Sequence, residues 1–466
     1  MGISVSQFNN DLYDEHIEEA AFLFELVASS LQESEFSWNE AIEFESRREA
    51  HIDALSIGGE VALKRCVELA ENGAGELYVY VSVILRQEKE AEFAARMTAL
   101  VLVDAANLLA LSCALAEHAT DSQLVYLSTQ NIESNCSVTL IAIRRAIGHI
   151  KGIVLLEALD QALHGRLDML LAAKSQEDKT IDEDMLAEQI GLFGLIAEGS
   201  FRAAHLVAVG SENEQIRRES TINLHCLALD VGKNPALQSD GSAAGVKAAI
   251  MIGAGPGYAR SLLSNLQSGV SEDILQALAL SGLPEVARPL VSLLDSDFAE
   301  TVAVALFYIT GAELFEVVFE EEEIDEGELF EEEQAEYELG NKPKRPDGEA
   351  YGEERTRVAV DPERWKQWLK ANRDKFNAGA RYRLGELITP DSLVRVLSKD
   401  NIPEWGRFYT EHELRCRYRM TEPFDISLNV RQQRQQLAAM QQSLSDSQKF
   451  VPGKWYVDGQ LLTGVE

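Results

Sequence analysis

The sequence predicts an all-α protein whose middle part is an α-solenoid of stacked helical repeats, with an acidic insertion and a small helical C-terminal unit. Apolar residues recur at helical spacing over most of the chain. A pattern of helix, Gly/Pro turn and helix occurs twice, at 250–266 and 278–294, and the two copies align at an offset of 28 residues with no gap in the alignment. The 466 residues are too many for one ordinary core, which favours an elongated stack or several units.

Composition and charge limit the class of partner. A hydrophobic content of 46% is enough for a packed interior, so the chain is not disordered overall. The formal net charge of -35 repels phosphate-rich polymers and anionic lipid surfaces. We therefore expect no binding to nucleic acid, and we expect another protein, preferably a basic one, as the partner.

An N-terminal helical region is expected over residues 1–130. Apolar residues between Ile17 and Val27 follow helical spacing, and similar patterns continue beyond them. Residues 1–20 contain Asp and Glu where a signal peptide would have a basic start and an apolar run, so we expect no signal peptide. The longest apolar run, 97–116, contains Asp104. It predicts a buried helix, or two helices with a turn, and no membrane span.

Helical repeats are expected over residues 131–315. In the two clear copies Pro256 aligns with Pro284, and Arg260 aligns with Arg288. Proline suits the first turn of the second helix, where its missing N–H has no partner to lose. One helix pair cannot bury both apolar faces, whereas stacked pairs share a continuous core, as in HEAT-like repeats. Further copies are expected around 192–209 and 222–237, and another begins at Ala305.

The segment Gly253-Ala-Gly-Pro-Gly257 has two interpretations. A nucleotide-binding loop would need the third glycine of GxGxxG, a preceding strand and the N–H that Pro256 lacks. The repeat offers a simpler explanation, because Pro284 takes the same place in the next copy. We predict a turn between two helices here, and no cofactor.

A flexible acidic insertion is expected over residues 316–356. Glu and Asp dominate as far as Glu338, and Pro343, Pro346 and Gly348 follow. Dense like charge with little apolar content cannot offset chain entropy. The alternative to a solvated charge run is a decoy or clamp for a basic partner.

A helical C-terminal unit is expected over residues 357–440. Asp361-Pro362 supplies an N-cap and a first-turn proline for its first helix. Trp365 and Trp368 share one face of that helix, either as core residues or as an exposed binding hot spot.

Two further features lie near the C-terminal end. The arginine-rich run 415–419 is interpreted either as an anion-binding patch or as a partner of the acidic insertion. In the tail, 441–466, Asp458-Gly459 stands between apolar pairs and predicts a β-hairpin.

No residue pattern promotes catalysis or metal binding. The five cysteines are far apart and form no CxxC pair, so we expect buried reduced thiols, with a disulfide or a metal site as the alternative. The eight histidines form no HExxH motif or tight His/Cys cluster, and no GxSxG serine is present. We predict that the protein is not an enzyme and has no catalytic, cofactor-binding or metal-binding residues.

Several motifs resemble an uncharacterised proteobacterial family of HEAT-like repeat proteins. They are Arg48-Glu-Ala-His-Ile-Asp-Ala-Leu55, Trp365-Lys-Gln-Trp368, Gly379-Ala-Arg-Tyr-Arg-Leu-Gly385, Tyr418–Pro423 and the Arg/Gln-rich run 431–436. Members of that family are often encoded beside type VI secretion spike and effector genes. The resemblance therefore implies a bacterial cytoplasmic adaptor, chaperone or immunity partner for a secreted effector, with no catalytic residues to carry over.

The leading hypothesis is a non-enzymatic protein-binding scaffold or adaptor, which serves as a chaperone or accessory factor for a type VI secretion effector or spike component. The alternatives are an immunity protein that blocks a toxin, a lyase-like enzyme on the same fold, and a nucleic-acid-binding repeat. The concave face of the repeats would hold the partner. For the two repeat arginines, helix capping or salt bridges are the alternative role. The candidate partner-binding residues are Arg260, Arg288, Trp365, Trp368, Arg381 and Tyr382.

Overall fold

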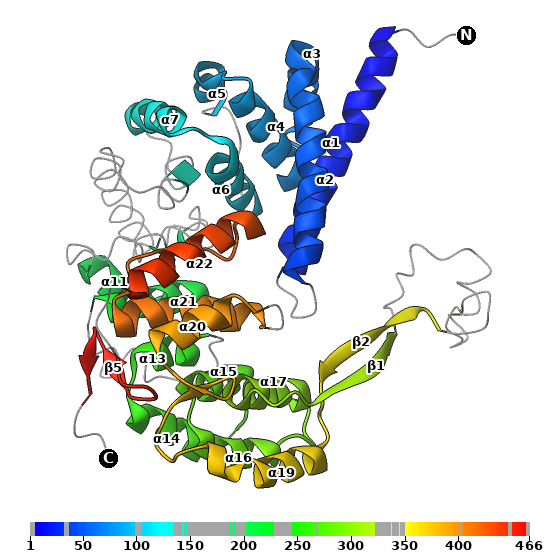
Figure 1. Cartoon of the computed structure of the whole chain (residues 1–466). Coiled ribbons are helices and arrows are strands. Elements are labelled where there is room, and N and C mark those ends of the chain that lie inside the picture. Colours follow the sequence, from blue (N-terminus) through cyan, green and yellow to red (C-terminus); the bar gives the residue numbers. More distant parts are fainter. Residues whose placement is uncertain are drawn as a thin grey trace.

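The described part of the chain is mostly helical (Figure 1). The structure is a computed structural model that describes residues 5–31, 37–97, 105–134, 202–227, 245–266, 269–321, 350–399, 402–445 and 450–462, with single positions between 142 and 191 and residues 337 and 344. In these residues there are eighteen α-helices and three small two-stranded sheets. The helical class agrees with the expectation from the sequence.

The N-terminal helices form a bundle around α4 (Ala74–Arg86). This helix is apolar from Leu77 to Leu85 and buried on nearly every side, and α1, α2, α3, α5 and α6 all pack against it. Ser37 and Glu40 form a capping box that starts α2. The other helices of the bundle are α1 (Val5–Ser30), α2 (Trp38–Ile57), α3 (Gly59–Leu69), α5 (Glu90–Met97), α6 (Ala105–His118) and α7 (Asp121–Ser134).

The long apolar run at 97–116 supplies most of α6. Leu108, Leu111 and Leu115 of this helix are buried, and the helix packs on α4. No helix among the described residues combines the length and the apolar character that crossing a bilayer requires.

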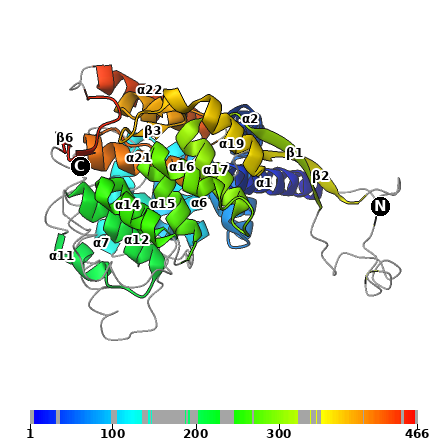
Figure 2. The same ribbon diagram turned by 90° about the horizontal axis from the view of Figure 1, so that it is seen from below.

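The middle of the chain forms two rows of helices (Figures 1 and 2). In the first row α12 packs on α13, α13 on α15, and α15 on α17. In the second row α14 packs on α15, while α16 contacts both α17 and α19. The predicted copies at 192–209 and 222–237 lie partly outside the described residues. The bounds are α11 (Arg202–Ala208), α12 (Glu214–Cys226), α13 (Val246–Gly253), α14 (Pro256–Asn265), α15 (Glu272–Ser281), the 3-10 turn Pro284–Val286, α16 (Ala287–Val291), α17 (Ala299–Thr310) and α19 (Pro362–Ala371).

The glycine- and proline-containing segment after α13 is a turn between helices, as predicted. Pro256 occupies the first turn of α14, and Pro284 begins the 3-10 turn before α16. A Cβ atom on Gly253 would lie 2.0 Å from Nδ1 of His225. Glycine is therefore needed here so that α13 can approach α12 closely.

The last helices of the chain, within the predicted unit 357–440, pack on both earlier parts of the fold. The helix that carries the tryptophans, α19, joins the second row, whereas α21 packs on α12 and α13 and so covers the first row. Helix α22 packs on α20 and also on α2 of the N-terminal bundle. These contacts between distant parts of the sequence could not be read from local patterns. The bounds are α20 (Pro390–Leu397), α21 (Glu404–Tyr418) and α22 (Val430–Ser445).

The ends of the predicted flexible insertion are paired strands. β1 (Phe315–Glu321) and β2 (Gly352–Val358) form an antiparallel ribbon that projects from the helices (Figure 1). The expectation of a mobile segment over 316–356 missed this ribbon, because it weighed the glutamates and overlooked the β-forming residues among them. The centre of the insertion lies outside the described residues.

Two smaller hairpins follow. β3 (Tyr382–Arg383) pairs with β4 (Glu386–Leu387), and β5 (Tyr456–Val457) pairs with β6 (Gln460–Leu461). The second hairpin turns at Asp458 and Gly459, whose φ angles are 50° and 73°. Two successive positive φ angles are those of the type I′ turn that the Asp-Gly signal predicts.

Candidate functional site

The structure separates the six candidate partner-binding residues into two groups. Trp365, Arg381 and Tyr382 are buried in the core, and Trp368 is half-buried with its ring centroid 6.5 Å from that of Trp365. The indole N–H of Trp365 donates to the carbonyl of Ala359 at 2.6 Å. Trp365 therefore has the core position that is one of its two expected alternatives, whereas Arg381 and Tyr382 are buried where a partner-binding surface is expected.

Arg260 and Arg288 form the second group. Both are exposed, on α14 and α16 of the second row. Among the described residues neither guanidinium forms an ion pair. Both side chains are therefore exposed on the second row, at positions that align in the two sequence copies.

The buried arginines donate hydrogen bonds to backbone carbonyls at the C-terminal ends of first-row helices. Arg381 donates from Nε to the carbonyl of Ser281, at the end of α15, at 2.9 Å. Arg417 donates to the carbonyls of Met251 and Ala254, at the end of α13, at 2.7 Å each. The last carbonyls of a helix have no intrahelical donor and carry the negative end of its dipole, so a cation here stabilises them.

One carboxylate sits at the centre of this cluster. Glu413 on α21 lies 2.5 Å from Arg381, 2.9 Å from Arg383 and 3.0 Å from Arg417, and all four side chains are buried. Burial alone would raise the pKa of Glu413, but the three guanidinium groups outweigh it and lower the pKa. Three cations and one anion leave an excess of positive charge, which the helix ends offset with about half a negative charge each.

Glycines let the segment around Arg381 close over the helix ends. Gly282 and Gly311 end α15 and α17 with φ angles of 67° and 64°. The N–H of Tyr382 donates to the carbonyl of Gly282, and the N–H of Leu384 donates to that of Tyr308. The Gly-x-Arg-Tyr-x-x-Gly motif therefore has a structural role here.

Among the described residues, the arginine run 415–419 pairs with carboxylates that lie outside the acidic insertion. Arg417 is buried as described, Arg415 contacts Glu411 on its own helix, and Arg419 pairs with Asp458 of the last hairpin. These contacts hold the C-terminal segment together.

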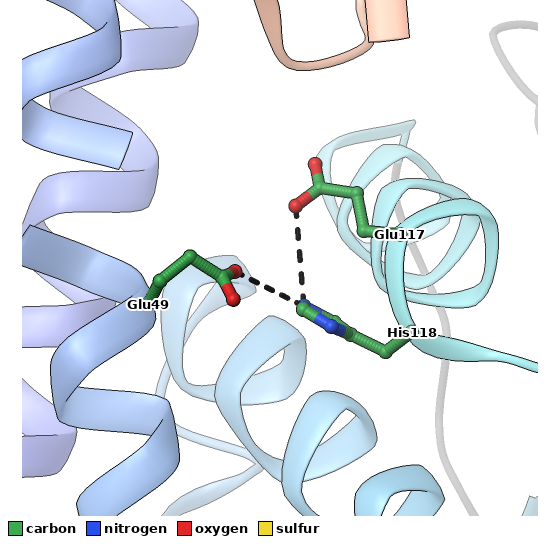
Figure 3. A group of neighbouring side chains, drawn as sticks. All are labelled: Glu49, Glu117 and His118. Atoms are coloured by element: carbon green, nitrogen blue, oxygen red, sulfur yellow. Dashed lines mark ion pairs between the residues drawn. The ribbon is translucent and has the colours of Figure 1, made fainter. Parts of the chain in front are cut away.

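A second polar cluster joins α2, α4 and α6 in the N-terminal bundle. Figure 3 shows three of its side chains, Glu49, Glu117 and His118. Nη2 of Arg48 lies 2.8 Å from Oε2 of Glu117, and the hydroxyl of Tyr78 donates to that same oxygen at 2.7 Å. His118 places Nε2 3.1 Å from the hydroxyl of Tyr78 and 3.7 Å from the carboxylate of Glu49. This cluster could not be predicted from sequence patterns, because glutamates are too abundant in the chain to single out two of them.

The protonation of this cluster follows from Arg86. Its guanidinium can only donate, and it faces Nδ1 of His118 at 3.2–3.3 Å, so Nδ1 is the acceptor. The pKa of His118 is held well below its usual value by burial and by the nearby Arg86 and Arg48. The ring is therefore neutral and carries its single proton on Nε2, which points at Tyr78 and the two carboxylates.

Glu49, Glu117 and His118 are close enough together to be considered as a metal site. A metal on Nε2 of His118 would require the ring proton on Nδ1, where it would meet the N–H groups of Arg86. Metal-bound histidines instead donate that proton to a carboxylate, a carbonyl or water. The donor pattern therefore fits a closed hydrogen-bond network and does not fit a metal centre.

The same region contacts the C-terminal helices. Glu45, next to this cluster on α2, accepts a hydrogen bond from the N–H of Val430 at 2.7 Å, at the start of α22. Gln432 donates to the carbonyl of Ala116. Burial raises the pKa of Glu45 to about 7, although the Val430 N–H and Arg48 oppose this. The polar cluster thus lies where the first and last parts of the chain meet.

The β1–β2 ribbon carries exposed apolar residues on one face. Val317 is 62% exposed and Phe319 is 51% exposed, and their spacing of two places them on the same side of the strand. Arg355 and Arg357 on the other strand pair with Glu320 and Glu316 of β1. Exposed large apolar side chains on a projecting element are typical of an interaction surface.

No family model, curated protein or solved structure matches this chain.

Proposed function

We propose that the chain is a non-enzymatic scaffold that binds another protein, and that the exposed face of the β1–β2 ribbon is a contact surface for it. The observation that carries the proposal is the pair Val317 and Phe319, which stays exposed on an element that projects from the helices. An apolar centre with a charged rim is the usual composition of a protein interface.

The charges around the ribbon favour a basic partner. Glu320 and Glu321 follow Phe319 on the strand, and Glu354 lies opposite it across the ribbon. The chain as a whole carries a formal net charge of -35. A protein with an apolar pocket and a rim of Lys or Arg would complement this surface, and the opposite charges would also speed its association.

The proposed architecture behind the ribbon is an α-solenoid of HEAT-like repeats. It is supported by the two rows of helices and by the aligned positions of Pro256 and Pro284. The motif resemblance extends the proposal to a bacterial adaptor or chaperone in the cytoplasm, with a type VI secretion effector or spike component as the partner. The exposed Arg260 and Arg288 are a second place where a partner could bind.

A site-specific crosslinking experiment tests the ribbon. A photoreactive amino acid replaces Phe319 in the full chain, which is then illuminated in extract of the native host. The matched control carries the same group at Phe22, an equally exposed aromatic residue on α1 at 58% exposure. We expect one basic polypeptide to be crosslinked from position 319 and not from position 22.

Substitution then tests the energy of the contact. Burying the exposed half of Val317 and of Phe319 contributes about 1 kcal/mol each. The double variant Val317→Ser, Phe319→Ser should therefore bind the purified partner about 30-fold more weakly, whereas Phe22→Ser should bind normally. Equal retention of the partner by both variants, or no crosslink from position 319, would overturn the proposal.

A further inference from the structure

Two cysteines from distant parts of the chain meet where α21 packs on the first row of helices. Cys226 ends α12, and Cys416 lies on α21, which packs on α12. Their sulfur atoms are 2.9 Å apart, although the residues are separated by 190 positions. Both are thiols in this structure.

This separation is close to bonding distance. Non-bonded heavy atoms have their optimum at roughly 3.5–4.0 Å, and a disulfide is about 2.05 Å long. The two sulfurs therefore need to move by less than about 1 Å to bond. The other described cysteines differ: Cys66 is buried in the N-terminal core, and Cys113 donates to the carbonyl of Ser427.

The two thiols have different environments. Cys226 is half-buried, whereas Cys416 is buried. The hydrogen bond from Cys416, followed by the positive charge of Arg415, lowers the pKa of Cys226. Burial, and the neighbouring sulfur, raise the pKa of Cys416 well above its usual value. Cys226 is therefore the thiol that ionises first and the one that an external reagent can reach.

We infer that Cys226 and Cys416 are a site of reversible disulfide formation, in which a small-molecule or protein disulfide is the oxidant. The Cys226 thiolate attacks one sulfur of the oxidant, forms a mixed disulfide and releases one thiolate. Cys416 then loses its proton and attacks the Cys226 sulfur, which releases the second thiol. Two protein thiols are oxidised, and one disulfide is reduced to two thiols.

The bond would fasten α21, which covers the first row, to α12 within that row. It would close a loop of 190 residues, and long loops give the largest loss of entropy in the unfolded chain. We expect oxidation to raise the melting temperature by about 10 °C.

Peptide mapping of the full-length protein tests the inference directly. The native protein is equilibrated with oxidised glutathione, quenched in acid, unfolded, alkylated and digested. We expect a crosslinked peptide pair that contains Cys226 and Cys416, and alkylation of the remaining three of the five cysteines. Return to reduced glutathione should restore all five sites. A mixed disulfide on Cys226 alone, or a crosslink between any other pair, would overturn the inference.

Variants provide a second measurement on the same protein. Cys226→Ser and Cys416→Ser should each abolish the rise in melting temperature that oxidation causes in the parent protein. Cys113→Ser, at another buried thiol, should leave both the rise and the crosslink in place. A rise that persists in Cys226→Ser would contradict the assignment. The mapping of the parent protein decides the question even if a serine variant folds poorly.

Discussion

Replacing Glu413 by Gln tests whether this carboxylate balances the buried arginines. The change keeps the size of the side chain and removes its charge, while Arg381, Arg383 and Arg417 stay buried. A buried charge that loses its partner costs about 3–5 kcal/mol. We expect a loss of about 3 kcal/mol, since the ends of α13 and α15 still hold part of the positive charge.

Thermal unfolding measures this loss. A cooperative unit of about 200 residues shifts by about 2–4 °C per kcal/mol, so Glu413→Gln should melt about 6–12 °C lower. Circular dichroism follows the helices, and tryptophan fluorescence reports on Trp455, whose ring lies 4.3 Å from the Arg381 guanidinium. The matched control is Glu363→Gln, which removes an exposed pair with Lys366 and should leave the melting temperature unchanged. A melting temperature for Glu413→Gln within the error of the parent would refute the proposed charge balance.

The effect of Glu413→Gln on the melting temperature should depend on pH in one direction only. The pKa of Glu413 is lowered in the folded chain, so its contribution is complete above the unfolded value of about 4.3 and is lost as the pH falls through the folded value. The gap in melting temperature between the parent and Glu413→Gln should therefore be widest at neutral pH and should narrow in acid. A gap that widens in acid would contradict the sign.

Three further predictions concern other parts of the molecule. Gly311→Ala should destabilise the chain by more than about 1 kcal/mol in urea unfolding, because the residue has φ 64° and its Cβ would lie 2.3 Å from the carbonyl oxygen of Leu384. Gly257→Ala, in α14 with nothing within 4 Å of the added Cβ, should instead leave stability unchanged or raise it by less than about 1 kcal/mol. The pKa of Glu45 is raised to about 7 in the folded chain, so the melting temperature should fall as the pH rises from about 4.5 through 7. In Glu45→Gln this dependence of the melting temperature on pH should be absent. Neither zinc nor a chelator should change the melting temperature. A metal on Nε2 of His118 would require a proton on Nδ1, and Arg86 donates to Nδ1. A rise in melting temperature that depends on metal would contradict the proposed tautomer.

Local chemistry accounts for what the sequence could predict. The N-cap of α19 at Asp361 accepts from the N–H groups of Glu363 and Arg364, and Pro362 follows it in the first turn. The Asp458-Gly459 turn and the prolines at the start of second-row segments are equally local. Each of these depends on residues within four positions of one another, so a single stretch of sequence contains the whole signal.

The clusters of buried charge could not be predicted in this way. Arg417 reaches a carbonyl 166 residues away, and Glu45 reaches an N–H 385 residues away. An arginine or glutamate side chain is predicted to be exposed to solvent unless its distant partner is known. For this reason Arg381 was expected on a binding surface, and Glu49, Glu117 and His118 were not singled out at all.

The position of the C-terminal segment changes where a partner should be sought. A helical-repeat scaffold commonly binds through the exposed face of one row. Here α21 covers α12 and α13, and the segment that contains Arg381 closes over the ends of α15 and α17. The chain's own last residues thus occupy much of the face that the first row would offer. Among the described residues of the two rows and the ribbon, the second row stays exposed at Arg260 and Arg288, and the ribbon exposes the large apolar side chains of Val317 and Phe319. If the scaffold function holds, a ribbon variant should therefore weaken binding more than replacement of both repeat arginines.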